Sequence, residues 1–151
     1  IDAASEFVLI HQFSTNRWHD GGDMLFDDEG FLYISLGEDT NVAKSQTLDG
    51  GLFGGVLRID VDMDASRSHP IRRQPMNKGT LPEGWEDSYA QGYFIPDDNP
   101  WVSAAGDYIE EFYAIGFRAP HRMTYDAVED QIWIGEVGEW QEEEVLVKEN
   151  P

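Results

Sequence analysis

Residues 116–145 read GFRAPHRMTYDAVEDQIWIGEVGEWQEEEV, and they hold a basic loop, a β-hairpin and an acidic loop in succession. The residues after Gly116 form a loop, because two arginines and a histidine need water, a carboxylate or a ligand for their cationic groups. Residues 123–126 and 131–134 are short apolar-aromatic runs around a polar turn, which is the pattern of a hairpin. Five glutamates follow within nine positions and suggest a bound cation: Glu136, Glu139, Glu142, Glu143 and Glu144.

The same pattern occurs earlier in the chain. Residues 24–27, a turn and residues 31–34 parallel residues 123–126, a turn and residues 131–134, and a Gly-Glu pair follows both copies. One more β-rich run comes after each copy, at 56–61 and 145–147. Repeated groups of short antiparallel strands are typical of propeller blades, because each small sheet buries its faces only against its neighbours.

The repeat predicts the fold and its division. The offset between the copies is 99 residues at the start and 89 at the end, so the repeat unit carries an insertion. We predict an all-β fold, namely a β-propeller fragment of about two four-stranded antiparallel blades and a long irregular insertion. Residues 1–151 form one partial domain, with blade-like units at about 1–62 and 109–151 and the insertion at 63–108. Aromatic residues and prolines in the insertion predict an ordered, irregular chain.

Composition limits the partners. The net charge of −20, from 30 acidic and 10 basic residues, repels a phosphate backbone, so we expect no nucleic acid partner. No apolar run approaches the roughly 20 residues of a membrane span. The acidic excess has a second interpretation as a solvated surface in salty surroundings, which stands beside cation binding. The absence of cysteine excludes disulfides and thiolate metal sites.

Several residues admit a structural or a functional interpretation. His19 lies in a loop and is either a surface residue or a proton acceptor, since imidazole titrates near neutral pH. Arg118 either serves a ligand or pairs with a carboxylate such as Glu136. Asp60 and its acidic neighbours lack the spacing of a calcium loop and are expected to be solvated. Aromatic side chains at alternating strand positions are expected in a core between blades: Tyr33, Tyr125 and Trp133.

These motifs resemble, in order, the soluble aldose (glucose and sorbosone) dehydrogenases, which are six-bladed β-propellers that use pyrroloquinoline quinone (PQQ) and calcium. The matching segments are HDGGDMLF at 19–26, DEGFLYI at 28–34, LRID at 57–60, IPDDNP at 95–100, GFRAPHR at 116–122 and GEVG at 135–138. The resemblance extends over nearly the whole chain. It implies a sugar dehydrogenase that oxidises the anomeric hydroxyl of an aldose by hydride transfer to the quinone, in the periplasm or outside the cell.

The resemblance also implies residue roles. His19 stands at the position of the catalytic base and Arg118 at that of the arginine that contacts the quinone oxygens. Gly138 and Glu139 stand where backbone carbonyls hold the calcium that also binds PQQ, and Glu144 stands at a carboxylate of a structural calcium site. Trp18 occupies a position where some members have Asp, so the residue that orients the imidazole is absent from its expected place.

Length leaves two hypotheses open. Six blades need roughly 300 residues, so the chain is expected to start within a propeller and to stop before its later blades. It is either the catalytic segment of a PQQ sugar dehydrogenase or a non-catalytic propeller module for binding or self-assembly, as in Hedgehog-interacting proteins of the same superfamily. Because an open fragment exposes sheet faces and edges, we expect a homo-oligomer or cover from the remainder of a longer propeller.

Overall fold

The computed structural model describes residues 2–76, 80–140 and 143–149, and across these residues the fold is all-β. Two short 3-10 turns, η1 (Ala3–Ser5) and η2 (Val42–Gln46), accompany the strands. The strands are β1 (Ile10–His11), β2 (Gly21–Phe26), β3 (Leu32–Leu36), β4 (Gly55–Ile59), β5 (Ser68–Pro70), β6 (Tyr89–Ala90), β7 (Phe94–Pro96), β8 (Phe112–Ile115), β9 (Pro120–Asp126), β10 (Gln131–Glu136) and β11 (Glu144–Glu149). None of the described helices has the length and hydropathy that a membrane crossing requires.

The first blade is a four-stranded antiparallel sheet in the order β2-β3-β4-β8. Its predicted hairpin is confirmed, because Met24 pairs with Ile34 and Phe26 with Leu32. Asp27 closes the turn with a carboxylate oxygen that accepts hydrogen bonds from the backbone N–H groups of Glu29 and Phe31. The fourth strand, β8, pairs with β4 across the whole insertion, so the first sheet is completed only at Ile115.

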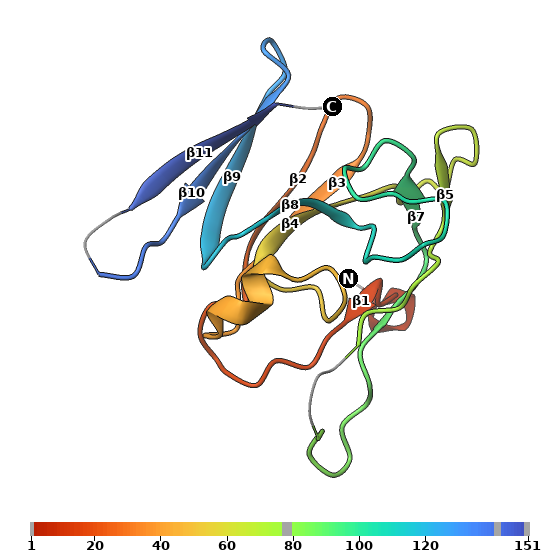
Figure 1. Ribbon diagram of the computed structural model, residues 1–151. Coiled ribbons are helices and arrows are strands. Elements are labelled where there is room, and N and C mark those ends of the chain that lie inside the picture. Colours follow the sequence, from red (N-terminus) through yellow and green to blue (C-terminus); the bar gives the residue numbers. More distant parts are fainter. Residues whose placement is uncertain (1, 77–79, 141–142, 150–151) are drawn as a thin grey trace.

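The second sheet, in the order β9-β10-β11, repeats the first three strands of this plan, which confirms the repeat inferred from the sequence. In the described residues it has three strands and not the four that were predicted. Ile134 pairs with Met123 on one side and with Leu146 on the other. The chain crosses from β8, the last strand of one sheet, to β9, the first strand of the next, and β9 lies against β2 (Figure 1). Neighbouring sheets in contact through their first strands are the arrangement of adjacent blades in a β-propeller fragment.

The two sheets share a core, and their first strands approach closely. The buried residues between the sheets are Phe31, Tyr33, Val56, Tyr113, Phe117, Met123, Ile132 and Ile134. At the closest approach, a Cβ added to Gly22 would lie 1.9 Å from the carbonyl oxygen of Pro120. The buried Ser35 hydroxyl donates to that same carbonyl at 3.0 Å. Glycine in β2 is therefore required by the contact between the blades.

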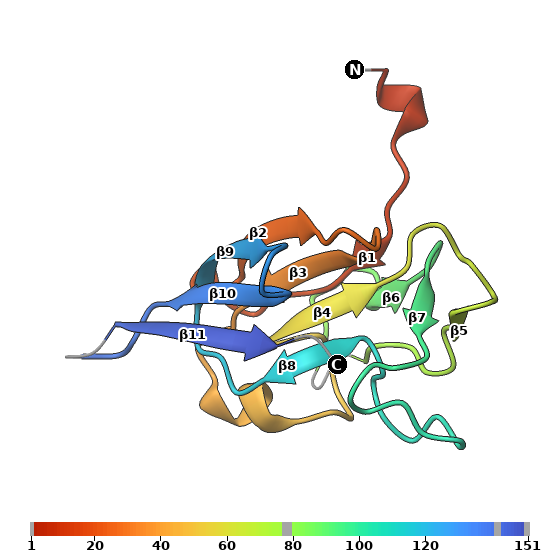
Figure 2. The same cartoon turned by 90° about the horizontal axis from the view of Figure 1, so that it is seen from above.

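The insertion covers the other face of the first sheet (Figure 2). Short strand pairs β1-β6 and β5-β7 pack there, and Tyr93 and Ile95 are buried against Leu32 and Ile59. In the apolar run of residues 7–13, only Ile10 and His11 form a strand, which is β1, and it pairs with β6.

The expectation that Asp60 is solvated is wrong, because its side chain is fully buried. Its carboxylate accepts hydrogen bonds from Ser68 Oγ at 2.7 Å and from the backbone N–H groups of Asp62 and Asp64. Burial alone would raise the pKa of Asp60, but these donors and Arg67 hold it below its ordinary value. The alternating acidic residues therefore build a turn that starts the insertion.

One face of the second sheet is open in the described residues. Trp133 pairs with Val147, and Gly135, two residues further along β10, pairs with Val145. The side chains of Trp133, Val145 and Val147 therefore share one face of the sheet. Trp133 is 41% exposed and Val145 70%, whereas Tyr33 is fully buried and Tyr125 packs against the core. Trp133 lies outside the core between these two sheets, because Ile132 and Ile134 on either side of it point into that core.

Candidate functional site

The sequence-predicted residues converge because of hairpin geometry. In a hairpin, the segment before the first strand and the segment after the second strand lie at the same end, opposite the turn. His19 precedes β2 and Glu38 follows β3, while Arg118 precedes β9 and Glu139 follows β10. The contact of β2 with β9 brings these two hairpin ends together.

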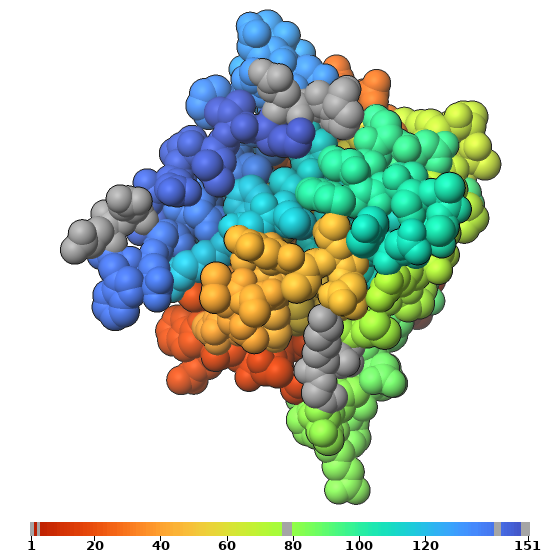
Figure 3. Space-filling view, in the orientation of Figure 1, coloured from red at the N-terminus to blue at the C-terminus, as the bar shows by residue number. Residues whose placement is uncertain are grey.

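The convergent loops line a cleft of about 600 Å³, which lies within the usual size range of ligand pockets. Its lining includes Trp18, His19, Glu38, Val42, Arg118 and Glu139. The η2 segment forms another wall and lies at the surface beside the β8–β9 connection (Figure 3), where Gly116 N donates to the Ser45 carbonyl. Both residues predicted to be catalytic, His19 and Arg118, therefore face one cavity.

His19 has a buried carboxylate partner that the sequence analysis missed. Its Nδ1 lies 2.7 Å from Glu38 Oε1, and the side chains are 19% and 5% exposed. A carboxylate at Nδ1 accepts the Nδ1–H hydrogen bond, so the Nε2 atom keeps a lone pair. Glu38 thus supplies the orienting group that is absent from the position of Trp18, and the pair has the geometry of an oriented general base.

The loop backbone holds His19 in place. His19 has a φ angle of 56°, and its carbonyl accepts a hydrogen bond from Asp39 N at 3.2 Å. Gly37 packs on this carbonyl so closely that an added Cβ would lie 2.1 Å from the oxygen. A residue with a side chain at position 37 would therefore displace His19 from Glu38.

The backbone of Arg118 is held between both blades. Its N–H donates to Glu136 Oε1 at 2.6 Å, as does Ala119 N–H at 3.1 Å. Its carbonyl accepts from Glu38 N at 2.9 Å. Burial raises the pKa of Glu136 above its ordinary value, although the two backbone donors oppose this shift. The alternative pairing of Arg118 with Glu136 is therefore present, but through the backbone of Arg118 and not through its guanidinium.

The guanidinium of Arg118 binds the loop that follows β10. Its Nη1 donates to the carbonyl oxygens of Val137 at 3.1 Å and of Gly138 at 3.0 Å. Two carbonyl oxygens thus converge on one cationic atom at the edge of the cleft, and the Glu139 side chain lines the same cleft. Backbone carbonyls and carboxylates are the kinds of oxygen ligand that calcium prefers, so these donors have the chemistry that the predicted ion needs, and the calcium itself stays a prediction.

The other acidic residues are dispersed. Glu144 begins β11 opposite Glu136, and Glu143 Oε2 accepts a hydrogen bond from Gly138 N. Glu142 lies outside the described residues. Within 2–76, 80–140 and 143–149, no group of three or more His, Asp or Glu side chains is placed to hold a metal ion. The structural calcium site at Glu144 stays a prediction.

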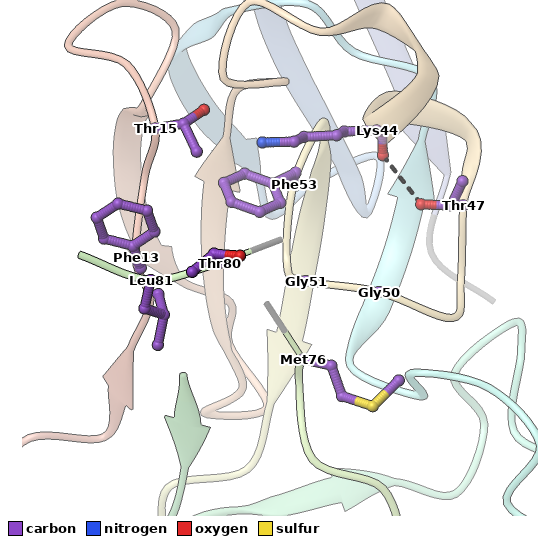
Figure 4. A pocket seen from close by; sticks show the side chains of 10 residues that line it. All are labelled: Phe13, Thr15, Lys44, Thr47, Gly50, Gly51, Phe53, Met76, Thr80 and Leu81. Carbon is purple, nitrogen blue, oxygen red and sulfur yellow. Dashed lines mark hydrogen bonds between the residues drawn. The ribbon is translucent and has the colours of Figure 1, made fainter. Parts of the chain in front are cut away.

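A second cavity lies on the other side of η2, and it is smaller and more enclosed. Its volume is about 80 Å³, and Phe13, Phe53 and Met76 are among its lining residues (Figure 4). Lys44 is the one ionisable side chain among the described lining residues, and it pairs with Asp39. Its Nζ also lies 4.3 Å from the ring centroid of Phe53. Among the described residues, its lining contains no histidine and no carboxylate, whereas the larger cleft is lined by both kinds of side chain.

The internal repeat contained a signal for Glu38. The Gly37-Glu38 pair, which follows β3, corresponds to Gly135-Glu136, which ends β10, and His19 and Arg118 have the same offset of 99 residues as Met24 and Met123. In both blades, this glutamate binds the loop before the first strand: Glu38 through the His19 ring and Glu136 through the Arg118 backbone. Extending the repeat alignment to the loops would have paired these residues.

The fold and the cleft define a propeller fragment with an oriented histidine and an arginine at one end of two adjacent blades. No family model matches the chain. It is 28% identical over 137 residues to the aldose sugar dehydrogenase YliI of Escherichia coli, covering 91% of this chain and 28% of that protein. It is 37% identical over 129 residues to the mouse Hedgehog-interacting protein, covering 83% of this chain and 15% of that protein.

A third relative, the HIPL2 protein of Arabidopsis thaliana, is 30% identical over 129 residues, covering 83% of this chain and 16% of that protein. The chain therefore spans less than a third of the length of each of these relatives. The comparisons place it among sequences similar both to a sugar dehydrogenase and to Hedgehog-interacting proteins.

Proposed function

We propose that the chain is the catalytic segment of a PQQ- and calcium-dependent aldose dehydrogenase that oxidises the anomeric hydroxyl of a sugar. The observation that carries this proposal is the cleft, in which the His19–Glu38 pair and Arg118 meet from two blades. Similarity to an aldose sugar dehydrogenase over 91% of the chain supports the reaction class. Bound PQQ would supply the acceptor for the hydride that leaves the anomeric carbon.

His19 takes the proton of the anomeric hydroxyl in this proposal. The Glu38 carboxylate fixes the Nδ1–H tautomer and stabilises the imidazolium that forms when Nε2 accepts the proton. Glu38 is buried and held by its own backbone N–H to the Arg118 carbonyl, so the ring is positioned before substrate arrives. The protein thus contributes position, a base and a compensating negative charge.

Arg118 and Trp18 serve binding in the same proposal. Arg118 would supply a planar cation toward the quinone oxygens, and the Val137–Gly138 carbonyls with Glu139 would provide oxygen ligands for the calcium. Trp18 is 62% exposed beside His19 and lines the cleft, so its indole offers an apolar surface to the carbon-bound hydrogens of a sugar ring.

The test is a calorimetric titration of the calcium-loaded protein with PQQ, with Arg118→Ala as the matched variant. Saturable binding that the variant loses supports the proposal, and a dye-linked aldose oxidation assay then compares the wild type with His19→Ala. Proton abstraction by a positioned base contributes about 10²–10⁴-fold, so the variant is expected to lose activity on that scale. Absence of PQQ binding by the wild type contradicts the proposal for the isolated chain.

A second candidate is a non-catalytic binding module. The observation that favours it is the 37% identity to the mouse Hedgehog-interacting protein, a protein named for a binding activity. The two candidates differ in what they require of His19. A binding module tolerates His19→Ala without loss of its interactions, whereas the dehydrogenase does not.

We also propose that the open face of the second sheet, which bears Trp133, Val145 and Val147, is covered in the working protein by further blades or by another copy of the chain. Exposed apolar strands of this kind mark interaction surfaces. Sedimentation at micromolar concentration tests self-association of the chain. The resemblance to the dehydrogenases further leads us to propose a periplasmic or extracellular location.

A further inference from the structure

The Arg118 guanidinium is bonded to the same loop that offers oxygens to a metal. A single nitrogen, Nη1, donates to both the Val137 and the Gly138 carbonyl oxygens, at 3.1 and 3.0 Å. The two oxygens therefore point toward one place, and a positive charge already lies there. A backbone carbonyl pair arranged in this way stabilises a cation of any kind, whether guanidinium or metal.

The backbone of Arg118 is held by both blades, whereas the hydrogen bonds of its guanidinium go to the loop after β10. The N–H is bonded to Glu136 Oε1 at 2.6 Å and the carbonyl to Glu38 N at 2.9 Å, so both sides of the residue are held by different blades. The long side chain changes position by rotation about its own torsions, without backbone movement. Because Arg118 lines the cleft, a guanidinium that leaves the carbonyls lies beside the cavity.

We infer that the Val137–Gly138 carbonyl pair is a cation site for which Arg118 and a divalent cation compete. Like charges repel at contact distance, so the metal and the guanidinium exclude each other from the two oxygens. Metal binding thus releases Arg118 into the cleft, where the guanidinium becomes available to an anionic ligand. This inference rests on the proposed function only for the identity of the cation, which we take to be calcium.

The release couples the two binding events. Without metal, an anionic ligand must first separate Arg118 from the carbonyls. The free energy that this separation costs weakens the binding of the anion. With metal present, the guanidinium is already free and the metal adds a second positive charge nearby. The metal and the anion therefore strengthen each other's binding, as thermodynamic linkage requires.

The test is a calorimetric titration of the protein with calcium chloride alone, comparing the wild type with Arg118→Ala. We expect the variant to bind calcium about tenfold or more tightly, because a charged competitor that donates to both carbonyls has been removed. Arg122→Ala is the matched control. It removes an equal charge from β9, and the described Arg122 hydrogen bond goes to the His121 carbonyl and not to this loop. We expect less than about a threefold change in the control, because exposed charges are screened.

Two further measurements keep the test independent of a single variant. Arg118→Lys retains a cation without the planar fork and is expected to bind calcium with intermediate affinity. In the wild type, the Arg118 side-chain N–H resonance is expected to shift as calcium is added, because its hydrogen bonds to the two carbonyls are lost. Thermal unfolding of each variant checks that it is folded.

Equal or weaker calcium binding by Arg118→Ala than by Arg122→Ala overturns the inference, as does an absence of calcium binding by a folded Arg118→Ala protein. A wild-type Arg118 resonance that is unchanged at calcium saturation overturns it too. None of these measurements uses sugar or quinone. A failed dehydrogenase assay therefore does not contradict the competition between Arg118 and calcium. A failed calcium titration likewise does not contradict the proposed dehydrogenase activity.

Discussion

Substitution of Glu111 by Gln is expected to change how the stability of the protein depends on pH. Glu111 immediately precedes β8 and is 1% exposed, and its Oε1 accepts a hydrogen bond from Tyr93 Oη in the insertion at 2.9 Å. Burial raises the pKa of Glu111 from 4.5 to about 7, and the neighbouring Glu110 charge adds to the shift. Glutamine has nearly the shape of the protonated carboxyl group but cannot ionise.

The sign and size of the pH effect on stability follow from the difference between the pKa values of Glu111 in the folded and unfolded states. The folded state binds the Glu111 proton more tightly than the unfolded state, so the stabilisation is complete below the unfolded pKa of 4.5 and is lost as the pH rises through about 7. The full shift corresponds to about 3 kcal/mol, of which about 2.5 kcal/mol is lost between pH 5 and pH 8. The Gln variant lacks this loss, so it is expected to be the more stable protein at pH 8.

Urea unfolding followed by tryptophan fluorescence measures this difference. The quantity to compare is the free energy of unfolding of Glu111→Gln minus that of the wild type, at pH 5 and at pH 8, because the other titrating groups cancel in the subtraction. Tyr93→Phe is the control. It removes a donor that favours the carboxylate, so it is expected to steepen the pH dependence. A difference that is the same at both pH values refutes the reasoning.

Three other substitutions probe the site and the contact between the blades. Gly37→Ala is expected to destabilise the protein by about 2 kcal/mol and to disturb the NMR signals of His19, because the new Cβ meets the His19 backbone. Gly21→Ala is the control that we expect to be tolerated, because a Cβ at Gly21 has nothing within 4 Å. Ser35→Ala is expected to cost about 1–3 kcal/mol in urea unfolding, since a buried carbonyl loses its donor; an unchanged midpoint contradicts that role. Glu38→Gln is expected to weaken the preference of His19 for the Nδ1–H tautomer, measured from its ¹⁵N shifts; a retained preference shows that another group orients the ring.

Much of the fold was predictable because each copy of the repeat has a local pattern of apolar and aromatic residues. Alternating apolar and aromatic residues at 24–34 and 123–134 are sufficient to specify hairpins, and both hairpins are present. The position of Phe112–Ile115 was harder to predict, because β8 joins β4 across the whole insertion. Such pairing depends on packing and not on local propensity.

The site was predictable in its members but not in its contacts. His19 and Arg118 were singled out from loop chemistry and resemblance, and they line the same cleft. Glu38 was missed, because a glutamate after a strand has no distinguishing local signature. The burial of Asp60 was missed for a similar reason. Its partners Arg67 and Ser68 lie where the following turn ends and β5 begins, and only the folded turn encloses the carboxylate.

The sequence alone therefore determined the strand pattern, the internal repeat, the acidic character and the residues able to do chemistry. These depend on short-range periodicity and on side-chain type, which the linear order preserves. Only the tertiary structure decided that Glu38 holds the His19 ring, that Glu136 holds the Arg118 backbone, and that the guanidinium lies on the Val137 and Gly138 carbonyls. Each of these contacts joins different loops, and its geometry is set by the packing of two blades against each other.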